Sequence, residues 1–182
     1  MTKIYFAGKI SKNDWRNTLT KKSLVTAGPL DDVETVCKHE YVGPFFMSCD
    51  HGCFHGHSSH GLTQRGYGGC CASNDGFSGS TGFTRDVIAN NCLRWIDYAD
   101  IVFAWINTKD CFGTLAEIGY AHAKNKPIWL VYSDVLFNIK LEWPTNIIPD
   151  RHDMWFIDQM AEKVAISNNP LEVYKKWSVE LV

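Results

Sequence analysis

Residues 101–121 carry the clearest pattern in this chain: IVFAWINTKDCFGTLAEIGYA. The first six residues are apolar, and most are β-branched or aromatic, which is typical of a buried strand in a parallel sheet. Thr114, followed three residues later by Glu117, has the spacing of a capping box and predicts that a helix begins there. A strand followed at once by a helix indicates an α/β fold, in which ligands gather at the carboxyl ends of the strands.

Further elements are predicted on both sides of this stretch. Compact apolar runs at Ile4–Ala7 and Ile128–Tyr132 predict two more buried strands, while Pro44 marks residues 41–46 as an edge strand or an extended loop. The predicted helices cover about residues 13–23, 84–99, 114–125, 154–166 and 170–181, with Thr84 as a cap and Pro170 in the favoured first position. This alternation predicts a doubly wound, mostly parallel α/β sheet of the Rossmann-like or flavodoxin-like kind.

Length and composition set the class of protein. A chain of 182 residues fits one domain, so we predict a single domain spanning residues 1–182. The net charge of −2 offers no basic surface for a nucleic acid or an acidic membrane, and no such partner is expected. No apolar stretch approaches the roughly 18 residues that span a bilayer, and the first strand begins too early for a signal peptide. We therefore expect a cytoplasmic protein.

Residues 48–83 form an unusual loop insertion. They hold nine of the fourteen glycines and show no helical or strand period, which is typical of a functional loop or lid. Four of the seven cysteines lie here and are expected to be reduced. One interpretation is a structural zinc site, although the spacing matches no standard finger. Its ligands would be Cys49, Cys53, His57 and His60. A metal-free lid that contacts the substrate, or a solvated loop, are the alternatives.

The turn after the first strand should meet the turn before Glu117 at one edge of the sheet. Gly8 would let the backbone approach a ligand closely. Lys9 or Arg16 could neutralise a phosphate, but a solvated surface position is the better default for each. The chain has neither a Gly-x-Gly-x-x-Gly pattern nor a Walker loop, so neither the usual dinucleotide-binding site nor an NTPase site is supported. From spacing alone, Glu117 is either a capping residue or a catalytic carboxylate.

Three segments resemble the nucleoside 2-deoxyribosyltransferase family: Ile4–Gly8, Asp97–Asp100 before the strand, and the specific run GTLAEIGYA at Gly113–Ala121. The resemblance implies that Glu117 is a nucleophile and that Tyr5 orients it by a hydrogen bond. It implies cleavage of the N-glycosidic bond of a (deoxy)nucleoside or nucleotide, with transfer of the sugar to another base. No cofactor is required for this chemistry, and a homo-oligomer is expected, in which a neighbouring subunit helps to close the site.

The chain also departs from the family at two positions. By this resemblance, the family carries an aspartate at the nucleobase where this chain has Cys111, and a second aspartate on the preceding helix where it has Cys92. Asp110 could take over the first role, which makes it a third catalytic candidate. The predicted substrate-contacting residues are Ala7, Gly8, Lys9, Trp15, Arg16, Phe46, Asp50, His51, His55, Cys92, Gly113 and Thr114. Two alternatives stay open. One is a nucleoside 5′-monophosphate or NAD N-glycoside hydrolase, and the other is a non-enzymatic zinc-stabilised binding module in which Glu117 is only a cap.

Overall fold

The computed structural model describes residues 1–9, 14–19, 34–36, 38–44, 77–78, 83–137 and 153–181. The chain divides into two compact units. The first comprises Met1–Lys9, Thr35–Gly43 and Trp95–Val182, and the second comprises Ile10–Glu34 and Pro44–Arg94. The prediction of a single domain stays a prediction. Among the described helices, none is long and apolar enough to cross a membrane.

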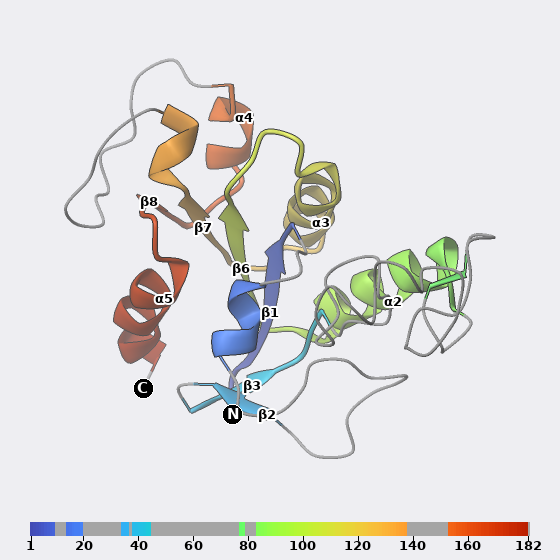
Figure 1. Ribbon diagram of the computed structural model, residues 1–182. Coiled ribbons are helices and arrows are strands. Elements are labelled where there is room, and N and C mark those ends of the chain that lie inside the picture. The colour runs from blue at the N-terminus through green and yellow to red at the C-terminus, as the bar shows by residue number, and fades with distance from the viewer. Residues whose placement is uncertain are drawn as a thin grey trace, which may run out of the picture. The chain divides into compact units, whose positions relative to one another are not determined.

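Six described strands form one sheet (Figure 1). In spatial order they are β2 (Glu34–Val36), β3 (His39–Tyr41), β1 (Lys3–Gly8), β6 (Ile101–Ile106), β7 (Ile128–Tyr132) and β8 (Lys163–Ile166). The five strands from β3 to β8 are parallel. From β1 the chain builds the sheet first on one side and then on the other, which is the flavodoxin-like order. The predicted fold class is therefore confirmed, and the strand order reverses between β1 and β6.

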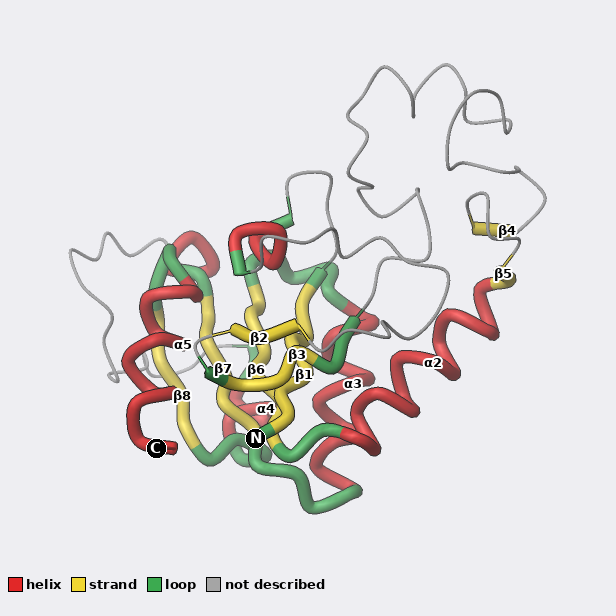
Figure 2. The backbone as a smooth tube through the Cα atoms, turned by 90° about the horizontal axis from the view of Figure 1, so that it is seen from below, coloured by secondary structure: helices red, strands yellow, loops and turns green. Residues whose placement is uncertain are grey.

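Helices cover both faces of this sheet, as Figure 2 shows. Helix α5 (Pro170–Ser178) packs its aromatic side chains on one face: Tyr174 lies 4.9 Å from Phe6 and Trp177 lies 6.0 Å from Trp129, measured between ring centroids. Helix α3 (Phe112–Ala123) covers the other face, toward which the alternate side chains of β1 point. Every residue of β7 is buried, as expected for a strand between two helical layers.

The last turn of helix α2 (Arg85–Tyr98) is fixed by side chains from the end of α3 and from the residues just after it. Lys126 Nζ donates to the carbonyl oxygens of Asp97 and Ala99 at 2.9 and 2.6 Å, and so satisfies acceptors at the helix end. The Asp97 carboxylate accepts from Tyr120 Oη at 2.9 Å and pairs with Lys124 at 3.1 Å. Asp97, which belongs to one of the segments that resemble the family, therefore has hydrogen-bond and ion-pair partners within the fold.

Two sequence predictions are wrong. The expected helix over 154–166 is the four-residue helix α4 (Trp155–Asp158) followed by β8, because residues 163–166 pair with β7 in register from Trp129 to Tyr132. Thr114 is not the N-cap of α3, since that helix begins at Phe112 and Cys111 occupies the cap position without a side-chain cap bond. The capping box is therefore absent, and Thr114 is buried inside the first turn.

The bounds of several other helices and strands can be compared with those predicted from the sequence. The helix expected over about residues 13–23 starts as the 3-10 helix η1 (Trp15–Thr18), capped by Asp14, and residues 20–33 lie outside the described part. Pro170 begins α5 as predicted, and η5 (Val179–Leu181) continues it. The extended stretch at 41–46 belongs to β3 up to Tyr41. The remaining short elements are β4 (Phe77–Ser78) and β5 (Phe83–Thr84), which pair antiparallel, and η4 (Asp134–Phe137).

Candidate active site

Tyr5 and Glu117 meet on the α3 face of the sheet. Tyr5 lies on β1 and is completely buried, while Glu117 lies on α3 and is half-buried. The Tyr5 hydroxyl donates a hydrogen bond to Glu117 Oε1 at 2.6 Å, across 112 positions of sequence. A bond to a carboxylate this short belongs to the stronger, charge-assisted class. The result is a carboxylate held in one orientation beside the point where the strand order reverses, where open α/β sheets bind their ligands.

The position of Glu117 within α3 changes the electrostatic argument. Because α3 begins at Phe112, Glu117 is its sixth residue and lies in the second turn rather than at the cap. The favourable effect of a helix N-terminus on a negative charge falls off within the first turn. The phenol of Tyr5 is therefore a more important local influence on this carboxylate than the helix dipole.

A second contact joins the same two segments at the carboxyl edge of the sheet. Lys9, which follows β1, donates from Nζ to Asp110 Oδ2 at 2.6 Å, and Asp110 directly precedes the N-cap of α3. Both side chains are exposed to solvent, at 42% and 62%. The Lys9 ammonium lowers the pKa of Asp110 below its ordinary value, so Asp110 is a carboxylate at neutral pH.

Cys111 and Thr114 line the buried side of this turn. Burial raises the pKa of the Cys111 thiol, which keeps it protonated and uncharged. The turn before α3 therefore holds a neutral, buried thiol. Cys92 and Cys111 are the two cysteines in the described residues; Cys92 is half-buried, and Cys111 is buried and free. Among the other predicted contacts, Ala7 and Gly8 end β1, and Gly113 is the exposed second residue of α3.

Trp15 and Arg16 belong to the second unit. Arg16 is completely buried, and its Nη1 donates to both carboxylate oxygens of Asp14 at 2.8 Å. The guanidinium also lies 5.0 Å from the ring centroid of Trp15. Arg16 is therefore already bound to a carboxylate within its own unit, a local pairing that was not expected from its sequence position.

Several predicted residues lie outside the described part of the chain. They are Phe46, Cys49, Asp50, His51, Cys53, His55, His57 and His60. Their roles, including the zinc set, stay predictions. Within the described ranges, no group of three or more His, Cys, Asp or Glu side chains is arranged to hold a metal ion.

One partly buried pair at this face was not singled out from the sequence. Tyr132, the last residue of β7, donates to Asp158 Oδ1 of α4 at 2.5 Å. Burial, together with this bond, raises the pKa of Tyr132 far above its ordinary value, so the phenol stays protonated. The bond holds α4, which is too short to be stable alone, against the sheet. A tyrosine that closes a buried strand at its carboxyl end was the signal that could have revealed it.

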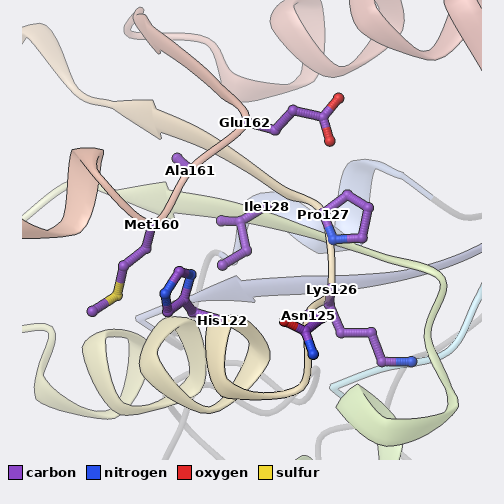
Figure 3. A pocket seen from close by; sticks show the side chains of 8 residues that line it. All are labelled: His122, Asn125, Lys126, Pro127, Ile128, Met160, Ala161 and Glu162. Carbon is purple, nitrogen blue, oxygen red and sulfur yellow. The ribbon is translucent and has the colours of Figure 1, made fainter.

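A separate hollow of about 390 Å³ opens at the edge where β7 begins (Figure 3). Its lining comes from the end of α3, the start of β7 and the segment before β8. The residues are His122, Asn125, Lys126, Pro127, Ile128, Met160, Ala161 and Glu162. None of the predicted site residues lines it, and β1 and β6 end at the opposite edge of the sheet. The hollow is thus distinct from the Tyr5–Glu117 site.

Comparison with known families supplies the deciding observation. The model of the family described as nucleoside 2-deoxyribosyltransferase matches residues 44–153, which is 110 of the 182 residues. The chain belongs to this family. Comparison with curated proteins and comparison with solved structures both gave no match.

The nucleoside 2-deoxyribosyltransferase match covers one half of the candidate site directly. It includes Asp110 and Glu117, whereas Tyr5 and Lys9 precede it in sequence. The two contacts between β1 and the β6–α3 segment therefore join a matched segment to an unmatched one. Family membership indicates an enzyme of nucleoside deoxyribosyl transfer, acting on a small nucleoside substrate.

Proposed function

We propose that the chain cleaves the N-glycosidic bond of a (deoxy)nucleoside with Glu117 as the nucleophile and transfers the sugar to another base. The observation that carries the proposal is the 2.6 Å hydrogen bond from Tyr5 to Glu117 Oε1 on the face beside the strand-order reversal. A carboxylate fixed by a buried phenol is oriented before the substrate arrives. Such preorganisation is the main source of electrostatic stabilisation in enzymes.

In the first step, a carboxylate oxygen of Glu117 forms a bond to C1′ as the bond from C1′ to the base nitrogen breaks. The bonding electron pair leaves with the base, which takes up a proton. Positive charge develops on the sugar in the transition state, and the carboxylate stabilises it. Tyr5 donates to the carboxylate throughout, which holds the carboxylate in its reactive orientation.

In the second step, a nitrogen of the incoming base attacks C1′ from the other face and releases the Glu117 carboxylate. The incoming base loses a proton in exchange. Each displacement inverts C1′, so two displacements retain the original configuration. Water in place of the second base would give hydrolysis through the same first step.

Chromatographic detection of released base tests the proposal. The protein would be incubated with a panel of nucleosides and their 5′-monophosphates, each with and without an acceptor base. We expect Glu117→Gln to lower the rate of base release at least about a thousandfold and to leave the circular dichroism spectrum unchanged. The matched control is Glu162→Gln, an exposed glutamate at the opposite edge of the sheet, which should retain activity.

The acceptor base distinguishes transfer of the sugar from hydrolysis. A new nucleoside formed only when acceptor base is present supports transfer, and base release that ignores the acceptor supports hydrolysis. Equal activity of the Glu117→Gln and wild-type proteins would contradict the assignment of the nucleophile.

A further inference from the structure

Asn107 is the first residue after β6, and it is not among the residues named from the sequence. It lies at the carboxyl edge of the sheet and begins the connection that leads to α3 and Glu117. On the other side of the strand-order reversal, β1 ends at Gly8, which pairs with Trp105, two positions before Asn107. Asn107 therefore stands at the edge, and beside the reversal, where open α/β sheets bind their ligands.

The carboxamide oxygen of Asn107 has no hydrogen-bond partner in the described part of the chain. Oδ1 is completely buried and meets no donor there. An orphaned acceptor of this kind lowers stability unless a ligand or a water molecule supplies the donor. The residue as a whole is only half-buried, and the terminal torsion of asparagine is broad. Turning Oδ1 toward a ligand therefore breaks no hydrogen bond of this oxygen.

The first turn of α3 leaves room between Glu117 and this edge. Gly113 lies one helical turn before Glu117 and therefore on the same side of the helix. It is exposed, and a Cβ added there would meet nothing within 4 Å. Tyr5, by contrast, is completely buried, which closes the direction toward the middle of the sheet. A nucleoside with C1′ at Glu117 therefore extends past Gly113 toward the carboxyl edge, where Asn107 lies.

We propose that Asn107 is a substrate-binding residue whose Oδ1 accepts a hydrogen bond from an uncharged N–H or O–H group of the nucleoside. This inference rests on the proposed function, since it concerns the substrate of the same site. An amino group of the base and a hydroxyl group of the sugar can each supply such a donor. Asn107 then serves the ligand and not the fold, because an apolar side chain of similar size would leave no acceptor unsatisfied.

Stability and affinity should therefore change independently in Asn107→Leu. No intramolecular hydrogen bond of Oδ1 is lost, so the urea midpoint should stay the same or rise. The matched control is Asn169→Leu, which loses the N-cap bond of α5, donated by the Glu172 N–H to Asn169 Oδ1 at 3.4 Å. This control should have a lower urea midpoint and an unchanged affinity for nucleosides.

Calorimetric titration in the Glu117→Gln background measures affinity without turnover. With the deoxynucleoside that this protein binds most tightly, we expect Asn107→Leu to weaken binding by about three- to tenfold, the usual effect of one uncharged hydrogen bond. Analogues that each lack one donor then locate the partner. For 2′-deoxyadenosine, they are the nucleoside of unsubstituted purine and the 3′-deoxy and 5′-deoxy forms. The analogue without the recognised donor should bind equally to both proteins.

The analogue for which the difference disappears assigns the donor to the base or to the sugar. A difference that persists for every analogue, no difference for any nucleoside, or a urea midpoint that falls as in Asn169→Leu would each overturn the role of Asn107. None of these outcomes depends on catalysis. The proposed function would fail separately, if Glu117→Gln released base as fast as the wild-type protein.

Discussion

Replacement of Tyr5 with phenylalanine removes one hydroxyl group and keeps the rest of a fully buried ring. The lost interaction is the 2.6 Å hydrogen bond to Glu117 Oε1. Hydrogen bonds to charged groups contribute about 1.5–3 kcal/mol, which corresponds to roughly 10- to 150-fold in rate. Because the bond orients the carboxylate rather than binding substrate, we expect the loss in kcat, with KM changed much less.

The stability of Tyr5→Phe should change far less than its activity. Glu117 is half-buried, so water can replace part of the lost bond, and we expect unfolding to be easier by about 1 kcal/mol or less. The matched control is Tyr174→Phe, which loses a buried hydroxyl contact to His39 Nδ1, 2.9 Å long, on the other face of the sheet. Steady-state kinetics and urea unfolding would be measured on both variants.

Two results would refute the reasoning. If Tyr5→Phe keeps kcat within about twofold, the phenol does not orient the reacting carboxylate. If Tyr174→Phe loses kcat to the same extent, the effect of Tyr5 is a general consequence of removing a buried hydroxyl. Only a loss specific to Tyr5 supports the geometry that we describe.

Two further predictions concern stability. Burial lowers the pKa of His39 below its ordinary 6.5, so on acidification the unfolded chain takes up the proton first. The contribution of His39 to stability should be complete above about pH 6.5 and decrease as the pH falls below it. The urea midpoint should therefore be higher at about pH 7.5 than at about pH 5.5, and this difference should be lost in His39→Gln but kept in His122→Gln, where the histidine is exposed. Gly43→Ala should lower the free energy of unfolding by about 1–3 kcal/mol, since φ is +134° and the added Cβ would lie 3.1 Å from Trp95, whereas Gly119→Ala, with open space around it, should be neutral or stabilising in the same urea titration.

The strands that could be predicted from sequence are those whose own apolar residues identify them, without knowledge of the neighbouring strand. β7 is buried at every position and β6 at every position except Trp105, and a continuous apolar run is sufficient to identify both strands. β8 has four residues, and Met154, Ile157, Met160 and Ala161 before it repeat at helical spacing. Its strand conformation comes from pairing with β7, and a local pattern does not contain that information.

The candidate site shows the same division. The residue types and the edge of the sheet could be predicted, and Tyr5, Lys9, Asp110 and Glu117 were all named from sequence. Thr114 was misplaced because Thr-x-x-Glu has the spacing of a capping box, while the glutamate side chain instead contacts Tyr5, 112 positions away. The pairing of Lys9 with Asp110 spans 101 positions and depends on the parallel register of β1 and β6.

The long sequence separation between Tyr5 and Glu117 also determines how freely the chain between them can vary. Pairing of β1 with β6 closes a loop of almost a hundred residues, since Tyr5 lies opposite Val102. The entropy of closing a flexible loop grows only with the logarithm of its length, and doubling the length costs about 0.6 kcal/mol more. Insertions and deletions between the two strands therefore cost little folding free energy, whereas a chain that lacks β1 would keep Glu117 and lose the phenol that is hydrogen-bonded to it.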